Sequence, residues 1–549
     1  MKRRLLISCT LITTMFSARA QSFDWAQSFK GSGEAVIRDI ATDASGNIYV
    51  FGDFNGSIDI DPTTNDSMVL ANGATDLFFA KADSNGAVQW IKTMGGVNNE
   101  AARGIAVDNN GNVILCGAFT TTMNFNPGGN PTNLAFLGVA DGFVAKYDNN
   151  GSLLWVRQQG GTAEIYTNGV ACDADGNVFI TGYYFGTMSP DHGITMISHI
   201  SQGQKDIFLT KFDSTGAFKW SRSVGGTSFD GGVAIAIDTN GDPVITGYYQ
   251  GVVDFDPGVG TVNDTANGGS DIFTCKFNTL GGYTWLNSGF FNGMYTDEPT
   301  SVHIGGDNKV YVTGYTNMQA LGLLMRLSET GQDEKFVALY HPTFAPGNNC
   351  IIYDVKTDAD ENFYICGAIN GSIDMNADTA STQVNLVTSN AADMFVGKYD
   401  TSGAQVFMKY SSTSDAQVNY ALALDPLGGI YLAGTFYDTI DCDYEATNAL
   451  IAADLGADAH LHRLRQAAPV SVVSAAPLPT ELLLYPNPAG NTLYLQGIEA
   501  GSNASIYSSD GRLVKQVRTI PGGAIDITAL PAGLYFIRAN AATGRFLKQ

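Results

Sequence analysis

Pairs of oxygen-bearing side chains recur along this chain, seven and nine residues after a glycine that ends a β-rich run. Alternate residues of an extended strand share one face. Carboxylate oxygens on one face suit a hard cation such as calcium, although a full coordination shell needs more oxygens than one pair supplies. The favoured interpretation is that these pairs cap the following turn, and calcium as a cofactor is the alternative. The predicted ligands are Asp59, Asp61, Asp254, Asp256, Asp441 and Asp443.

A second candidate site lies where the spacing of the repeated segments changes. The segment after Gly314 is shorter than its counterparts, and the connection after Phe336 is longer. In a sheet of four antiparallel strands both segments emerge at the same end, so the change predicts an asymmetric pocket there. Its aromatic and amide side chains suit a sugar or a peptide, and drift of a surface loop is the alternative. The predicted lining is Tyr340, His341, Phe344, Asn348 and Asn349.

Two further histidines and the catalytic motifs complete the search for chemistry. His460 and His462 share a strand face and could bind a transition metal, but no third ligand is identifiable, so packing is the favoured interpretation. The sequence contains no nucleophile elbow, no zinc-protease motif and no phosphate-binding glycine loop. Carboxylate pairs for glycoside hydrolysis are defined by their separation in space, which leaves a hydrolase or lyase open.

The elements that would position these residues come from one repeated stretch. Asp271 to Trp285 has close copies that begin at Asp76, Asp141 and Asp206, each 65 residues after the last. An Asp-x-x-Gly turn followed by a β-rich run repeats in step with it, and seven cycles can be counted. Self-similarity at a fixed period predicts an array of one supersecondary unit, and four short strands per cycle suit a propeller blade.

Every cycle carries a basic residue five positions after the start of its third expected strand. A catalytic group is needed once, whereas a packing or ion-pair role can be needed in every blade. We therefore interpret these cations as structural. They are Lys81, Lys146, Lys211, Lys276, Arg326, Lys398 and Arg463.

The two ends of the repeat are incomplete in complementary ways. Trp25 stands 65 residues before Trp90 without the three strands that should precede it, and no fourth strand follows Arg463. Pairing the N-terminal strand with the last three would complete one blade and remove an exposed sheet edge. The pattern Asp-x-Phe-x-x-Lys-x-Asp-x-x-Gly-x-x-x-Trp resembles the bacterial β-propeller repeat family. The resemblance implies an all-β fold, a seven-bladed propeller over residues 21–466, and no shared catalytic set.

Charge and the N-terminal residues bear on location and partners. Residues 1–20 combine a basic start, an apolar run and a small-x-small site at Ala18 to Ala20, which predicts a secretory signal. Removing their four cations takes the formal charge from −23 to −27. Such a surface repels nucleic acid and anionic membranes. No other segment reaches the roughly 20 apolar residues of a membrane span.

The repeat ends before a small C-terminal domain. Residues 467–480 are small and proline-bearing, which predicts a linker. Residues 481–549 resemble the type A sorting domain of the type IX secretion system, through Tyr485-Pro-Asn-Pro488, Leu530-Pro-Ala-Gly-Leu-Tyr535 and Gly544-Arg-Phe-Leu-Lys548. The alternating strands and tight turns also predict a small β-sandwich. The resemblance implies recognition by the type IX machinery, and a secreted or surface-attached protein.

These observations favour binding over catalysis. Every repeated feature has a structural interpretation and no catalytic motif is present, so we expect a non-enzymatic module that binds a glycan, a protein or a cation. A polysaccharide-active hydrolase or lyase on the same scaffold is the alternative. The fold by itself names neither ligand nor reaction.

Overall fold

The computed structural model divides the chain into two compact units, one holding residues 20–467 and the other residues 468–549. The described residues are 21–59, 67–288, 296–316, 321–339, 349–374, 385–387, 391–411, 415–444, 450–466, 482–496, 501–509, 512–520, 523–539 and 542–549. All elements in these ranges are β-strands, so the expected all-β class is confirmed. No helix that could cross a membrane occurs among them.

Within these ranges, the strands of the first unit pair antiparallel in sets of four: five sets are separate sheets, and two more are joined in one ten-stranded sheet. The first three sets are β2 (Ala35–Thr42), β3 (Ile48–Phe54), β6 (Asp76–Ala82), β7 (Val88–Met94); β8 (Glu100–Val107), β9 (Val113–Phe119), β12 (Asp141–Tyr147), β13 (Leu153–Gly161); and β14 (Ile165–Cys172), β15 (Val178–Ser189), β16 (His199–Phe212), β17 (Phe218–Gly226). The next two are β18 (Gly231–Ile237), β19 (Pro243–Tyr249), β22 (Asp271–Phe277), β23 (Tyr283–Asn287); and β24 (Asp297–Ile304), β25 (Val310–Thr316), β26 (Leu321–Leu327), β27 (Asp333–Leu339). The last two are β28 (Asn349–Thr357), β29 (Phe363–Asn370), β32 (Asp393–Tyr399), β33 (Gln405–Tyr410); and β34 (Gln417–Leu424), β35 (Gly429–Asp441), β36 (Leu450–Gln466), β1 (Gln21–Phe29).

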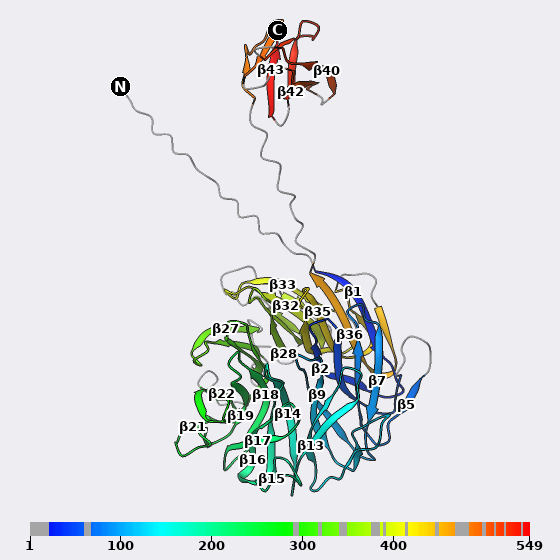
Figure 1. Ribbon diagram of the computed structural model, residues 1–549, viewed down its shortest axis with the longest axis vertical. Helices are drawn as coiled ribbons and strands as arrows, with labels where there is room; N and C mark the ends of the chain where they lie inside the picture. The colour runs from blue at the N-terminus through cyan, green and yellow to red at the C-terminus, as the bar shows by residue number, and fades with distance from the viewer. Residues whose placement is uncertain are drawn as a thin grey trace, which may run out of the picture. The chain divides into compact units, whose positions relative to one another are not determined.

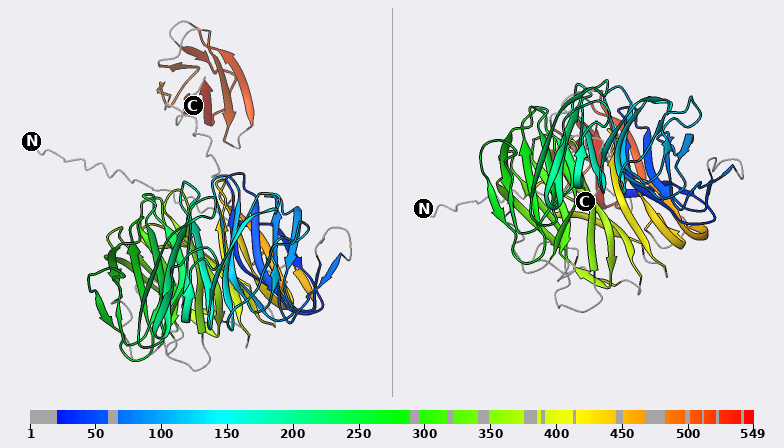
Figure 2. Two further views of the ribbon diagram at one scale, coloured as in Figure 1. Left: turned by 60° about the horizontal axis from the view of Figure 1, so that its bottom comes forward. Right: turned by 90° about the horizontal axis from the view of Figure 1, so that it is seen from below.

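The sheets stand side by side around a common centre (Figures 1 and 2). Middle strands such as β3, β6, β9 and β12 are buried at every residue. One hydrophobic cluster combines Tyr49 and Phe79 of the first set with Val113 and Phe143 of the second. Because the cores lie between neighbouring sheets, an isolated set could not bury both of its faces.

All five tryptophans make the same bond between neighbouring sets. The indole N–H of each one donates to a backbone carbonyl in the turn between the third and fourth strands of the next set. The bonds run from Trp25 to Ser84 (3.1 Å), Trp90 to Asn149 (3.2 Å), Trp155 to Ser214 (3.2 Å), Trp220 to Thr279 (3.0 Å) and Trp285 to Glu329 (2.9 Å). The repeated tryptophan therefore fixes the spacing of the sheets.

Five of the seven repeated cations form ion pairs with the first turn aspartate of their own set, as the structural interpretation predicts. Lys146 contacts Asp108 at 2.8 Å and Lys276 contacts Asp238 at 2.6 Å. Burial raises the pKa of Asp108 and Asp238, but the lysine and the hydrogen bonds to each carboxylate together outweigh it, so the pKa of both aspartates is lowered. Arg326 pairs instead with Glu334 at 3.2 Å.

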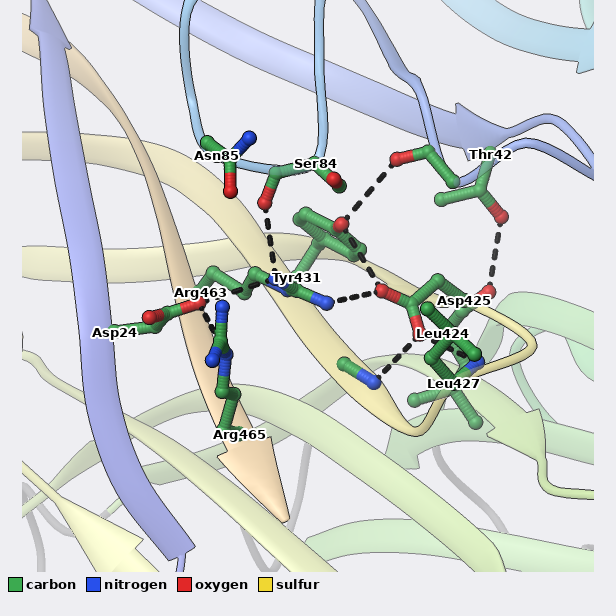
Figure 3. A network of polar contacts seen from close by, with 12 residues as sticks. Asp24, Thr42, Ser84, Asn85, Leu424, Asp425, Leu427, Tyr431, Arg463 and Arg465 are labelled. Carbon is green, nitrogen blue, oxygen red and sulfur yellow. Dashed lines mark hydrogen bonds and ion pairs between the residues drawn. The ribbon is translucent and has the colours of Figure 1, made fainter. Parts of the chain in front are cut away.

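The N-terminal strand pairs with the last strand of the first unit. β1 lies antiparallel to β36, with Gln21 opposite Gln466 and Phe29 opposite Ala459. Figure 3 shows Arg463 of β36 between Asp24 of β1 and the turn residue Asp425. Arg463 also donates to the Ser84 carbonyl of the first set at 2.9 Å. One buried guanidinium thus connects both ends of the repeat.

Short two-stranded arms extend the connections between the second and third strands. They are β4 (Ser57–Asp59) with β5 (Met68–Leu70), β10 (Met123–Asn124) with β11 (Asn133–Leu134), β20 (Val252–Asp254) with β21 (Asn263–Thr265), and β30 (Ser372–Asp374) with β31 (Asn385–Val387). β20 pairs with the end of β17, so an arm also attaches to the preceding set.

The second unit contains two sheets around one core. Their orders are β37 (Leu484–Tyr485), β38 (Thr492–Leu495), β41 (Ala524–Asp526), and β40 (Leu513–Arg518), β39 (Asn503–Ser508), β42 (Gly533–Ala539), β43 (Ala542–Lys548). Leu493 of the first sheet and Ile506, Ile537 and Phe546 of the second belong to the same buried cluster.

Replacing Arg463 with methionine should lower the free energy of unfolding of the full chain by about 3 kcal/mol, because Asp425 would stay buried without its cation. Arg465→Met is the matched control: its side chain is 55% exposed and also pairs with Asp24. An exposed ion pair contributes less than about 1 kcal/mol. Urea denaturation measures both variants, and equal losses would contradict the role given to Arg463.

Buried carboxyls should make the first unit more stable near pH 5.5 than at pH 8. Burial raises the pKa of Asp206, Asp297 and Glu100 to about 7. The folded chain then keeps protons that the unfolded carboxyls, with pKa values near 4, have lost. The stabilisation is fully present below the unfolded pKa and disappears as the pH rises through 7. Asp297→Asn should raise the melting temperature at pH 8 and leave it unchanged at pH 5; a pH-independent effect would refute this.

Candidate functional site

The structure tests the sequence-predicted sites only in part. Tyr340, His341, Phe344, Asn348 and Asp61 lie outside the described residues. Asn349, the remaining member of the predicted pocket, is exposed at the first position of β28. The pocket proposed around it therefore stays a prediction.

Asp254 and Asp256 use their carboxylates to cap the arm of the fourth set. One oxygen of Asp254 accepts the backbone N–H of Asp256 at 3.1 Å and that of Val262 at 2.8 Å. At the equivalent place in the second set, Asn124 accepts the N–H groups of Asn126 and Thr132 in the same way. Since an amide oxygen serves equally, capping accounts for these contacts without a cation.

The other predicted metal ligands lie on equivalent arms. Asp59 ends β4, and its backbone N–H donates to the Lys30 carbonyl at 2.8 Å. Asp441 accepts the N–H of Asp443 at 3.2 Å, and burial followed by the contact with Asp443 raises the pKa of Asp441. In the described part of the chain, no three His, Cys, Asp or Glu side chains gather as a metal site. Calcium binding stays a prediction.

His460 and His462 are fully buried and use their ring nitrogens within the fold. Their Nδ1 atoms are 3.3 Å apart, His460 Nε2 lies 3.2 Å from the Val418 carbonyl, and His462 Nε2 lies 2.9 Å from the Tyr444 hydroxyl. Burial lowers the pKa of His460 to about 4, so the ring is neutral. These contacts agree with the packing interpretation.

A central cavity of about 580 Å³ is lined by the first strand of every set. Each of these strands has a β-bulge at the same place, and the bulged residue lines the cavity. A bulge places one extra residue in a strand and redirects its side chain. We call these residues the bulge ring: Arg38, Arg103, Asn168, Val233, Thr300, Tyr353 and Tyr420.

One side of the ring is a stack of cations and aromatic rings. Tyr166 and Tyr183 are stacked with centroids 5.3 Å apart. Arg103 covers Tyr166 at 5.5 Å and Lys205 covers Tyr183 at 4.1 Å. The arginine is exposed, whereas the two tyrosines are half-buried. The stack therefore presents a positive charge held in place by two aromatic rings.

The other side is built from Tyr353 and Tyr420 of adjacent sets. Their rings meet edge to face at 4.8 Å, and Arg38 lies over Tyr420 at 5.7 Å. Arg38 Nε and Nη2 donate to the two carboxylate oxygens of Asp53, at 2.8 and 3.0 Å. Burial raises the pKa of Tyr353 and of Tyr420, so both hydroxyls stay protonated donors. This side offers neutral aromatic surface with hydrogen-bonding ends.

Tyrosines on the second strands of the fourth and fifth sets extend the aromatic surface. Tyr315 donates to Glu298 at 2.8 Å, and Tyr248 lies against Gly231, where a Cβ atom would come within 2.8 Å of the ring. Together with Tyr166 and Tyr183 they form what we call the tyrosine rim: Tyr166, Tyr183, Tyr248 and Tyr315. Strand register places these four residues and the bulge ring at the same end of the inner strands.

Charged groups deeper in the cavity are engaged within the fold. Lys356 contacts both oxygens of Asp354, at 2.7 and 2.8 Å, and Ser301 donates to the same carboxylate at 2.7 Å. Asp39 accepts the backbone N–H groups of Ile40 and Ile105. Burial, then the charge of Asp354, raises the pKa of Asp39 to about 7. These carboxylates support neighbouring strands, which is a structural use.

Sequence reasoning missed the bulge ring although a signal was present. Arg38, Arg103, Asn168 and Val233 stand 65 residues apart, yet the residue type changes from arginine to asparagine and then valine, while the residues two positions later stay aliphatic. A position that varies in register with a regular repeat is free from the packing role that the repeat serves. Residue types alone do not reveal a bulge, so the sequence did not show that these side chains line a cavity.

Family models match a short part of the first unit and nearly all of the second. Residues 154–183 match the family described as Beta-propeller repeat, and residues 483–549 match the Secretion system C-terminal sorting domain. The C-terminal unit is a type IX secretion sorting domain. This domain marks proteins that the type IX system exports to the cell surface or the medium, so the expected location is confirmed.

Curated relatives of the sorted protein match only a part of its repeat. An uncharacterized WD repeat-containing protein of Acanthamoeba polyphaga mimivirus is 24% identical over 43% of this chain and 19% of its own length. The regulatory protein FlaEY of Caulobacter vibrioides is 24% identical over 27% of this chain and 15% of its own length. The chain thus spans less than a fifth of either relative.

Solved structures are similar at low identity. The extracellular domain of a two-component system from B. thetaiotaomicron has a TM-score of 0.38 at 12% identity, covering 97% of this chain and 60% of that one. The NanB sialidase of Streptococcus pneumoniae has a TM-score of 0.33 at 10% identity, covering 81% and 70%. No ligand or reaction is transferred from them to this sorted protein.

The capping role of Asp254 predicts that Asp254→Asn leaves the melting temperature unchanged, because Asn124 already performs that role in the second set. Asp254→Ala should lower the free energy of unfolding by about 1 kcal/mol, the usual net contribution of a hydrogen bond. Differential scanning calorimetry with chelator and then with calcium measures both. A calcium-dependent rise in melting temperature that Asp254→Asn abolishes would instead assign the residue to a cation.

Proposed function

We propose that this exported protein is a seven-bladed β-propeller that acts as a non-enzymatic binding module, with the bulge ring and the tyrosine rim as its ligand site. Each set of four strands serves as one blade, and β1 completes the last. The observation that carries the proposal is the bulge repeated in all seven inner strands, which turns one variable side chain per blade into the cavity.

The chemistry of the site favours a glycan. Protonated tyrosines provide apolar faces for the C–H surface of a sugar ring and hydroxyls for its polar edge. The cavity volume of about 580 Å³ falls in the usual range for small ligands. Arg103 adds one exposed cation that could meet a carboxylated or otherwise acidic sugar.

Catalysis has less support from the same residues. Hydrolysis of a glycoside generally uses two carboxyl groups that face the scissile bond. Asp39 and Asp354 accept hydrogen bonds from backbone and side-chain groups of neighbouring strands. A binding role needs no free carboxylate. The candidate calcium ligands lie on the two-stranded arms and not in the bulge ring.

The proposal predicts that Tyr353→Ala with Tyr420→Ala weakens binding to the retained polysaccharide about tenfold, which corresponds to about 1.4 kcal/mol. The full mature chain is incubated with a panel of insoluble polysaccharides, and both protein depletion and soluble sugar are measured. Tyr494→Ala is the control, since Tyr494 is 37% exposed in the sorting domain.

The two readouts separate the candidate functions. Depletion that needs Tyr353 and Tyr420, without released sugar, supports the binding module. Release of soluble sugar that acid-to-amide substitutions abolish would replace it with the hydrolase or lyase. Depletion that is equal in the double variant and in the wild type would remove the bulge ring as the site.

A further inference from the structure

An exposed sheet face in the sorting domain lacks a structural explanation. In the sheet β40-β39-β42-β43, alternate residues such as Ile506, Ile537 and Phe546 enter the core. The residues between them form what we call the outer face: Tyr507, Leu534, Phe536, Arg538, Arg545 and Leu547. Soluble domains usually cover one face of such a sheet with polar side chains.

The outer face is apolar at its centre. Leu534, Phe536 and Leu547 are each 43% exposed. Strand pairing places Phe536 between Tyr507 and Arg545, and Leu534 opposite Leu547, so these side chains are direct neighbours. A contiguous exposed apolar surface of this kind marks an interaction site.

The same face is positive. The four strands contain no Asp or Glu, and three of their five cations, Arg518, Arg538 and Arg545, lie on the outward side, whereas Lys515 is paired with Ile506 and Lys548 is buried. Arg538 and Arg545 are exposed, and neither has a carboxylate partner among the described residues. Residues 481–549 have a formal charge of +2, whereas residues 21–466 have −29. The cations of this face are therefore a local exception in an acidic chain.

We propose that the outer face is the surface by which the type IX machinery recognises this chain, and that the machinery meets it with an acidic surface containing an apolar strip. A sorting domain must be read by the apparatus that sorts it, and the opposite face of this sheet is occupied by the domain core. Arginine and aromatic residues are the side chains that most often dominate such interfaces.

Export from a bacterium with a type IX system tests the assignment on the full chain. Phe536→Ser and Arg538→Glu should each lower the amount at the cell surface and in the medium about tenfold, because central aromatic and arginine contacts dominate binding. The chain should accumulate in the periplasm instead. Cell fractionation with immunodetection measures the distribution.

Matched controls lie in the same domain away from the outer face. Tyr494→Ser removes an exposed aromatic residue from the other sheet, and Arg512→Glu reverses an exposed charge in the turn before β40. Both should be exported normally. Thermal melting of the purified variants checks that the domain stays folded, and Arg538→Lys should restore most of the export.

Several results would overturn the proposal. Normal export of Phe536→Ser and Arg538→Glu would remove the face from recognition, as would equal losses in tests and controls. Loss with Phe536→Ser but not with Arg538→Glu would refute the acidic partner. A dimer that Phe536→Ser dissociates without changing export would reassign the face to contact between copies of the chain.

Discussion

The hydrogen bond from each tryptophan indole to a turn carbonyl of the next set is the contact on which the arrangement of sheets depends. A four-stranded sheet whose middle strands are apolar on both faces needs a neighbour on each side. Hydrophobic contact supplies the attraction but not the register, because it has no direction. A bond of 2.9–3.2 Å between fixed groups supplies that register five times. In the fifth and sixth sets Phe336 and Phe407 replace the tryptophan, and there Arg326 reaches the Thr401 carbonyl at 2.6 Å.

Fixed outer contacts leave the inner strands free to vary. The bulge separates two tasks along each inner strand, since the aliphatic residues beyond it pack between sheets while the bulged residue lines the cavity. Arg103, Asn168 and Val233 occupy one backbone position in three consecutive sets and share no chemistry. A substitution there changes the ligand site without disturbing the ion pairs or indole bonds at the periphery. This separation explains how a regular repeat can hold an asymmetric site.

Sequence periodicity was sufficient to predict the strands, the structural role of the repeated cations and the pairing of β1 with β36. Each of these depends on residue types that recur at one spacing. The capping role of Asp254 was also the favoured interpretation of the sequence, since a short carboxylate before a turn has that use in general. The bulge ring was not predictable in the same way. A bulge is a mismatch between two strands, and neither strand records the register of its partner. The five residues first predicted to line a pocket came from loop length, which measures how much chain is present and not where its side chains point.

Charge distinguishes the two units in a way that suits successive tasks. The repeat tolerates a strong negative charge for two reasons. Its buried cations contact turn aspartates, and burial raises the pKa of Asp206 and Asp297 to about 7. Acidic repulsion keeps such a chain soluble and discourages contact with anionic surfaces. The sorting domain needs the opposite property, since it must be captured. In the sorting domain, arginines without a carboxylate partner within the described ranges lie beside exposed apolar side chains on a sheet without acids. An acidic partner can bind this surface, whereas it is repelled by the negative charge of the repeat.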